Sequence, residues 1–318
     1  MIPDIAKEEL FVGHQSPIVC LKVILQLALM DNLSPRTQGL IAINIAAVVF
    51  GSAALYGKLD ISPFWIVGLR AGFAALALSV FGYFKKESIG VSSRDQWPPL
   101  LITGSILAVH WLMFFASVQI SGVAVATLTF AAFPLFTVVI ETFFERRRPR
   151  WAEIVAASAI IFAVSLLVKP ANDNGNLLGI GAGIASAVTF AWFGYASKNL
   201  AKALSPRRIS LLQNAVVFVL SAPCLFFAAP QPSHAAEWLW LILLGVVTTA
   251  LMHQLYFYAL KRLSASTCSG FVALEPVYAI LFAAMIFQEP LTPWVGASAL
   301  LIVGASFVLL KMEPAAAA

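Results

Sequence analysis

One acidic side chain lies deep within an apolar stretch of the sequence. Glu275 stands nine residues into a hydrophobic run over residues 266–288, directly before Pro276. A charged carboxylate near the middle of a bilayer costs on the order of 3 kcal/mol or more, so such residues are usually functional or specifically paired. The position favours a site that exchanges a proton or binds an amine. The alternative is structural: Glu275 would bond to backbone groups left free by Pro276.

Two histidines and one arginine lie in similar stretches. His110 and His253 are 143 positions apart and open related sequences, HWLMFFAS and HQLYFYAL. Imidazole titrates near physiological pH, so either could pass on a proton, although pairing with a neighbouring helix is the alternative. So wide a separation is a weak metal signal, and no metal or cofactor is expected. Arg70 could bind a ligand carboxylate through its planar fork, or it could have a structural or gating role.

Further polar and aromatic residues would decorate a cavity between such helices. They are Asn44, Tyr56, Trp111, Thr127, Thr129, Phe130, Trp192, Tyr195, Gln254, Tyr256, Tyr258 and Tyr278. Aromatic walls with a few convergent polar groups suit small amphipathic ligands. The alternative is that they anchor helices at the membrane surface, where Trp and Tyr are common.

The elements that carry these residues must be membrane helices. The 318 residues are 60% hydrophobic and 11% charged, and the mean hydropathy is +0.89. Soluble domains carry about 25% charged residues, so the composition excludes a soluble protein. Because the apolar runs are close to 20 residues long and do not alternate, they predict α-helices rather than barrel strands.

Ten membrane-spanning helices are predicted, each long enough to cross about 30 Å of hydrocarbon. They cover residues 38–57, 63–84, 97–119, 123–144, 151–169, 177–198, 209–229, 237–259, 266–288 and 293–311. Residues 1–37 precede them as a cytoplasmic or interfacial segment. The apolar run at 17–30 within it is expected to lie on the membrane surface or to be sequence upstream of a start at Met30, with an eleventh span as the remaining alternative.

The distribution of charge predicts the orientation. With the N-terminus in the cytoplasm, seventeen of the twenty Lys and Arg residues fall in cytoplasmic segments, and Lys58 and Lys169 fall on the other side. This bias predicts both termini in the cytoplasm of a plasma (cell inner) membrane protein. Because the net charge of +5 is collected on one membrane face, it does not indicate nucleic-acid binding.

The sequence contains an internal repeat. Residues 110–151 match 253–294 at an offset of 143 with a one-residue gap. Earlier matches pair Gly39, Phe50 and Lys58 with Gly179, Phe190 and Lys198, and the stretch Pro63 to Arg70 with Pro206 to Gln213. Each half, 38–169 and 177–311, holds five predicted spans, and a tail follows at 312–318. An odd number of spans makes the halves face opposite ways. Inverted repeats are typical of alternating-access carriers with a substrate site near the midplane.

A family resemblance follows from a set of motifs. They are Phe50, Gly51, Ser52 and Lys58 in the first span, Arg70 in the second, Pro134 and Pro276 in the fourth and ninth, and Glu145 and Glu289 at the ends of those two. With the repeat, this pattern resembles the drug/metabolite transporter superfamily, EamA-type branch, over residues 38–311. Phe50 departs from the family, which usually shows Trp there. The resemblance implies a secondary carrier, often an exporter of amino acids or related metabolites, with a cavity lined by spans 1, 3, 4, 6, 8 and 9.

The sequence offers no support for ATP-driven or hydrolytic chemistry. It contains no Walker loop, no GxSxG and no HExxH, so an enzyme is not expected. The expected partners are a small-molecule substrate, protons and the lipid bilayer, and small residues in 293–311 would also suit a homodimer. Two alternatives stay open: a membrane scaffold or subunit without transport, and a flippase of a lipid-linked molecule.

Overall fold

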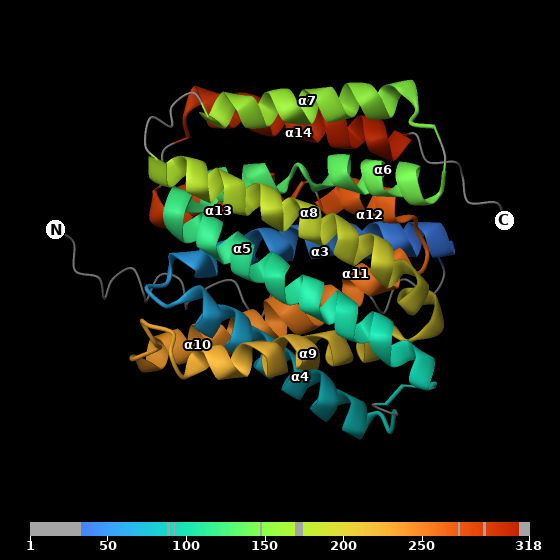
Figure 1. Ribbon diagram of the computed structural model, residues 1–318, viewed down its shortest axis with the longest axis vertical. Coiled ribbons are helices and arrows are strands. Elements are labelled where there is room, and N and C mark those ends of the chain that lie inside the picture. The colour runs from blue at the N-terminus through green and yellow to red at the C-terminus, as the bar shows by residue number, and fades with distance from the viewer. Residues whose placement is uncertain are drawn as a thin grey trace.

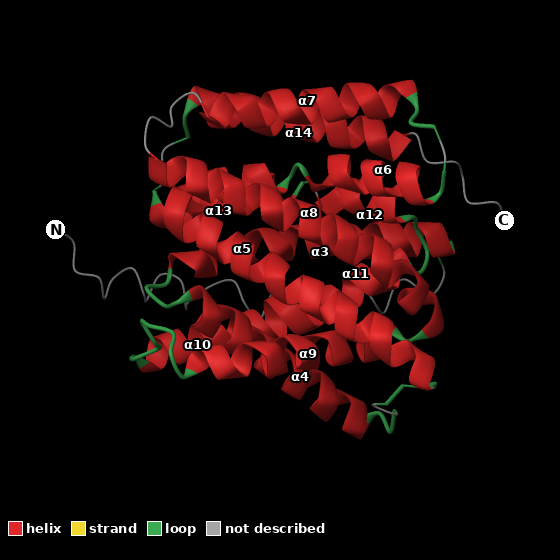
Figure 2. Ribbon diagram, in the orientation of Figure 1, coloured by secondary structure: helices red, strands yellow, loops and turns green. Residues whose placement is uncertain are grey.

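The computed structural model describes residues 33–87, 90–91, 93–146, 148–168, 174–272, 274–288 and 291–311. The apolar run at 17–30 and the tail at 312–318 lie outside these residues, as do Lys169 and Glu289. Every described secondary-structure element is a helix (Figure 2), which agrees with the helical architecture that the composition predicted.

The helices form one bundle whose long elements run alongside one another (Figure 1). In the N-terminal part they are α3 (Pro35–Ala53), the 3-10 helix η2 (Ala54–Lys58), α4 (Pro63–Phe84), η3 (Arg94–Gln96), α5 (Trp97–Phe130), α6 (Phe133–Phe144) and α7 (Trp151–Val168). In the C-terminal part they are α8 (Asn174–Ala203), α9 (Pro206–Leu225), α10 (Ala235–Leu243), the π-helix η4 (Leu244–Leu251), α11 (Met252–Leu260), α12 (Ala265–Val272), α13 (Glu275–Phe287) and α14 (Pro293–Lys311).

Several helical stretches are suited to a membrane. Within the described residues, seven are long and apolar enough to cross one. Three shorter apolar helices, Phe133–Phe144, Trp151–Ala163 and Pro293–Ala305, fall within the predicted fourth, fifth and tenth spans. The structure therefore supports a multi-pass membrane protein, and the count of ten spans stays a prediction.

Proline and serine residues define where several helices begin. Pro63 and Pro206 are the first residues of α4 and α9, where the missing N–H has no intrahelical partner to lose. Ser34 and Ser205 cap α3 and α9. The Ser34 side-chain oxygen accepts from the backbone N–H of Thr37 at 3.2 Å, and that of Ser205 accepts from the backbone N–H of Arg208 at 3.3 Å.

The predicted spans over 123–144 and 266–288 are broken near their middle. One break separates α5 from α6, and the other separates α12 from α13 just before Glu275. Pro134 and Pro276 lie within the first two positions of the following helices, and neither can donate the amide hydrogen bond that would continue the preceding helix. The chain thus has discontinuous helices at corresponding places in its two halves.

The link between the predicted third and fourth spans, residues 120–122, contains one residue with a non-helical backbone. Gly122 lies inside α5 with φ 83° and ψ 170°, a backbone conformation that costs glycine little and other residues much. The boundary predicted between the spans 97–119 and 123–144 therefore falls at Gly122, where two helical segments of α5 meet.

The helix packing follows the internal repeat. Helix α4 packs on its repeat equivalent α9 at the lower edge of Figure 1, and α7 packs on its equivalent α14 at the upper edge. Between them, α5 packs on α8, and the equivalent pair α11 and α3 do the same. Each half therefore contributes matching helices to the centre of the bundle.

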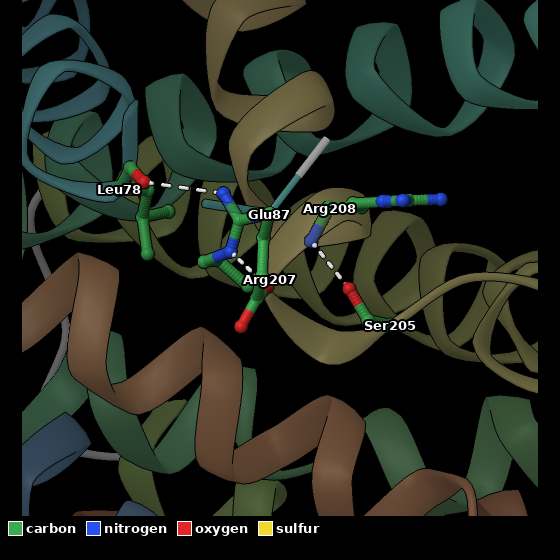
Figure 3. A network of polar contacts seen from close by, with 5 residues as sticks. All are labelled: Leu78, Glu87, Ser205, Arg207 and Arg208. Carbon is green, nitrogen blue, oxygen red and sulfur yellow. Dashed lines mark hydrogen bonds and ion pairs between the residues drawn. The ribbon is translucent and has the colours of Figure 1, made fainter. Parts of the chain in front are cut away.

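Helices α4 and α9 are tied together at both ends. At one end, the Arg207 guanidinium donates from Nε to Glu87 Oε2 at 2.7 Å and from Nη1 to the Leu78 carbonyl at 3.4 Å (Figure 3). At the other end, the indole N–H of Trp65 donates to the Ala228 carbonyl at 3.0 Å. Because Arg207 is only 4% exposed, this ion pair is partly shielded from water and joins the two halves.

Candidate functional site

A small cavity lined by buried residues lies between the two halves of the chain. It is lined by Phe50, Ala53, Arg70, His110, Trp111, Phe114, Phe130, Phe190, His253 and Glu275. Every one of these residues is at most 8% exposed. The cavity volume is about 30 Å³, which corresponds to roughly two water molecules. Helices α3, α4, α5, α8, α11 and α13 all reach it, so both halves build the site.

Arg70 is the cation of the cavity. Its Nε donates to Thr249 Oγ1 at 3.1 Å, and its Cζ lies 3.9 Å from the centroid of the Trp111 ring. A guanidinium over an indole face at this distance gains a cation–π attraction, which is strongest where water is excluded. The Phe115 ring centroid lies 5.4 Å from the same Cζ. Because Arg70 is 2% exposed, these protein contacts, rather than solvent, set the orientation of its guanidinium.

Glu275 is the acid among the lining residues. It is the first residue of α13, where the helix dipole and unpaired amides favour a negative charge. Gly51 of α3 makes this placement possible, since a Cβ there would lie 2.7 Å from the Tyr278 Cβ and 3.1 Å from the Glu275 carbonyl oxygen. The backbones of α3 and α13 therefore touch beside the acid, and the cavity contains both a buried cation and a buried acid.

His110 is anchored to α8. Its Nδ1 lies 3.0 Å from the Ser186 carbonyl oxygen and 2.8 Å from Ser186 Oγ. Because a carbonyl oxygen can only accept, the first contact requires the proton on Nδ1. The ring also lies against Phe190 and Phe130, with centroids 4.9 and 5.3 Å away.

His253, the repeat equivalent of His110, has different surroundings. Its ring stacks on Trp111, with centroids 5.3 Å apart and planes at 28°. Its Nδ1 is buried and has no hydrogen-bond partner within the part of the chain that the structure describes. The repeat thus places two histidines at one cavity, but only His110 is held by a hydrogen bond to the described residues.

The cavity brings together six of the sixteen residues that the sequence singled out as candidates for the site. These are Arg70, His110, Trp111, Phe130, His253 and Glu275. The lining helices fall in all six of the expected spans: α3 in the first, α5 in the third and fourth, α8 in the sixth, α11 in the eighth and α13 in the ninth. Arg70 adds α4, the second span, to that set.

The other ten candidates, Tyr56, Thr127 and Tyr256 among them, lie outside the cavity lining. Asn44 and Thr129 donate to carbonyls of their own helices, Leu40 at 2.9 Å and Val125 at 2.8 Å. Tyr258 donates to Gln38 Oε1 at 2.7 Å and lies under Arg262. Trp192 and Tyr195 pack on Phe144, and Trp192 is 37% exposed. Gln254 and Tyr278 are half-buried outside the lining.

Four lining residues were not among the sequence candidates. They are Phe50, Ala53, Phe114 and Phe190. The internal repeat pointed to three of them, because Phe50 matches Phe190 and Phe114 matches Phe257. The ring centroid of Phe257 lies 6.1 Å from that of His253. Apolar residues that the repeat preserves beside a polar one were therefore the missing clue.

Comparison with known proteins agrees with the repeat. The sequence model of the EamA-like transporter family matches residues 37–169 and again residues 177–311. The chain belongs to the EamA-like transporter family. Curated relatives of this family member include "Uncharacterized transporter YxxF" of Bacillus subtilis, 26% identical over 77% of this chain and 81% of the relative. Another is an "Uncharacterized transporter" of Archaeoglobus fulgidus, 26% identical over 82% and 93%.

A solved crystal structure shows the same fold for this EamA-like chain. It matches with a TM-score of 0.68 and 20% sequence identity over 88% of this chain and 99% of the other. Among the described residues, no group of three or more His, Cys, Asp or Glu side chains is placed to hold a metal ion. The site is therefore read as a cavity of charged, imidazole and aromatic groups in a transporter fold.

Proposed function

We propose that this protein is a secondary transporter, active or facilitative, that moves a small metabolite bearing a carboxylate, such as an amino acid, by alternating access. The observation that carries the proposal is that Arg70 and Glu275 are buried and line one cavity to which both halves contribute. Buried ionisable residues of membrane helices mark substrate and ion pathways. Discontinuous helices, such as those broken before α6 and α13, are also typical of carriers.

The chemistry of the cavity suits an amino acid. The guanidinium of Arg70 can bind a carboxylate through two parallel hydrogen bonds, and Glu275 can bind an ammonium group. Phenylalanine rings at positions 50, 114, 130 and 190 provide an apolar surface for the rest of the molecule. A zwitterion with an apolar side chain would therefore satisfy both charges and the wall.

The cavity must enlarge before it can hold such a substrate. Its volume of about 30 Å³ is far below the roughly 300 Å³ at which ligand pockets begin. The lining residues are all buried, so this conformation favours an occluded carrier over a groove open to lipid. The breaks before α6 and α13 supply the places where helix segments can move apart.

Glu275 is the proposed coupling residue. Its carboxyl group can carry a proton when no substrate amine is bound and release it when one binds. The titratable and charged groups that face it across the cavity are Arg70, His110 and His253. With both termini in the cytoplasm of the inner membrane, as the charge bias favours, exchange of substrate for inward-moving protons would export the metabolite.

A scaffold without transport is the second class of function that the sequence left open. Such a protein has no need of a buried arginine and a buried glutamate beside a cavity, because each costs free energy in an apolar bundle. The polar lining at the centre therefore favours the carrier.

Counterflow into proteoliposomes tests the proposal. The vesicles would be loaded in turn with each of a set of unlabelled L-amino acids, and entry of the same radiolabelled amino acid would be followed. We expect saturable uptake of at least one amino acid with an apolar side chain, such as L-leucine, and no competition from its methyl ester, which lacks the carboxylate. Absence of counterflow for the whole set, or equal competition by the ester, would overturn the amino-acid assignment.

A further inference from the structure

A π-helical segment faces the arginine of the cavity. Residues Leu244–Leu251 form η4, a helix type that is rare and often found at functional sites. The Thr249 hydroxyl donates to the Leu244 carbonyl, five residues earlier, at 2.6 Å. The same oxygen accepts from Arg70 Nε at 3.1 Å. Because the hydroxyl proton is used within η4, the lone pairs of Thr249 remain free to accept from the guanidinium.

Close packing fixes η4 against α4 at this point. A Cβ on Gly245 would lie 2.5 Å from the Phe73 Cβ and 2.8 Å from the Arg70 carbonyl oxygen. These distances are too short for any side chain, so glycine allows the two backbones to meet beside Arg70. Since α4 belongs to the first half and η4 to the second, the contact of Arg70 with Thr249 spans the boundary between them.

The other half of the chain has a related contact without the charge. Gln213 of α9 occupies the repeat position of Arg70, and its Nε2 donates to Thr103 Oγ1 of α5 at 2.7 Å. A link from this position to a threonine of the opposite half is thus common to both. Gln213 does not line the cavity, and Thr103 lies in an α-helical segment. Of these two contacts between the halves, the one made by the cationic residue is therefore the one whose threonine lies in a π-helix.

Contacts with Thr249, Trp111 and Phe115 account for the orientation of the Arg70 side chain. Thr249 occupies Nε, and the Trp111 face covers the plane of the guanidinium. No described residue accepts a hydrogen bond from Nη1 or Nη2 of Arg70, although the residue borders the cavity. The two terminal nitrogens of the fork are therefore left available to an oxyanion.

We propose that Thr249 is a positioning residue for the substrate site. By accepting from Nε, it holds the guanidinium so that Nη1 and Nη2 present a bidentate fork to the carboxylate of the substrate. The inference rests on the proposed function, because it assigns the fork to a carboxylate. It adds a residue that lies outside the cavity lining and acts only through Arg70.

The test compares Thr249→Val, Thr249→Ser and Thr248→Val in the full-length protein in detergent. Valine keeps the shape of threonine but cannot accept a hydrogen bond, whereas serine keeps the hydroxyl. Thr248 is a matched control, because its buried hydroxyl donates to the same Leu244 carbonyl at 2.7 Å and makes no described contact with Arg70. Binding of L-leucine would be measured by calorimetry, with leucine methyl ester as the probe without a carboxylate.

We expect Thr249→Val to weaken leucine binding about tenfold, the size of one lost hydrogen bond to a charged group, while Thr249→Ser and Thr248→Val bind like the wild type. Hydrogen exchange of the Arg70 Nε–H, followed by NMR of protein labelled with ¹⁵N-arginine and assigned with Arg70→Lys, gives a readout that needs no substrate. This exchange should be fast in Thr249→Val and slow in the other two variants.

The outcomes separate the two proposals. If the wild type binds leucine and Thr249→Val binds it equally well, the positioning role is overturned and the transporter proposal stands. Exchange of the Nε–H that is as slow in Thr249→Val as in the wild type would also overturn it. If the wild type does not bind leucine, leucine is not the substrate, and the exchange rates alone still decide whether Thr249 holds Arg70.

Discussion

Arg70 lies with its guanidinium carbon 3.9 Å above the centroid of Trp111, and the same indole stacks on His253 at 5.3 Å. Trp111 therefore contacts both a cation and an imidazole, and both of them border the cavity. An indole is the best cation–π partner among the aromatic side chains. The stack explains how an arginine can be held at the centre of an apolar bundle without a described salt bridge.

Replacing Trp111 should weaken substrate binding through Arg70. In Trp111→Leu the guanidinium loses a cation–π contact worth about 2 kcal/mol when water is excluded, so affinity should fall roughly thirtyfold. Calorimetry with a counterflow substrate measures this loss. Trp192→Leu is the matched control, since Trp192 lies on Phe144 outside the cavity. Equal losses in the two variants would contradict a specific role for Trp111.

Replacing Glu275 should uncouple transport from protons. Glu275→Gln keeps the size of the side chain but cannot bind or release a proton, so flux driven by a pH gradient should be abolished. Exchange of labelled for unlabelled substrate at equal pH should remain measurable, since it needs no net proton movement. Proteoliposomes with an imposed pH gradient provide the measurement. Glu145→Gln is the control, because it changes a half-exposed acid whose Oε1 lies 4.0 Å from Lys198 Nζ, and it should retain the driven flux. Unchanged driven flux in Glu275→Gln would rule out proton coupling at Glu275.

The contact of α3 with α13 should be intolerant of any side chain at position 51. In Gly51→Ala the new Cβ would lie 2.7 Å from the Tyr278 Cβ, and forcing the helices apart should cost about 1–3 kcal/mol. The thermal unfolding midpoint in detergent should fall, and substrate affinity should fall with it because Glu275 moves. Gly181→Ala is the control, since nothing lies within 4 Å of its added Cβ. A midpoint as high as that of the control would show that the contact is not tight in solution.

The features that sequence predicted well are those with a strong local cause. Pro63 and Trp151 begin α4 and α7 at the predicted residues, because proline and interfacial residues mark helix starts. The breaks before α6 and α13 were not predicted, since the apolar run continues through them and hydropathy does not register a missing amide hydrogen bond. Only the prolines pointed to them.

The same distinction holds for the site. Arg70, His110, His253 and Glu275 could be chosen from the sequence because an ionisable group in an apolar helix is costly and therefore conspicuous. The aromatic wall could not be chosen that way, because the chain has 24 phenylalanines and burial depends on which helices meet. Likewise Asn44 and Tyr258 could have faced a cavity, but their nearest partners in space are a carbonyl of the same helix and Gln38.

The two equivalent histidines should respond differently to the same change. In His110→Phe, Ser186 Oγ loses its described partner and the hydrogen bonds at 2.8 and 3.0 Å disappear, which should cost about 1–3 kcal/mol of stability. In His253→Phe, a buried nitrogen without a described partner is removed and the stack on Trp111 is kept, so the unfolding midpoint should stay the same or rise. Transport should nevertheless fall in His253→Phe, because the imidazole borders the cavity. Thermal unfolding and counterflow of both variants check the pair, and a loss of stability in His253→Phe as large as that in His110→Phe would show that His253 is also held by a hydrogen bond.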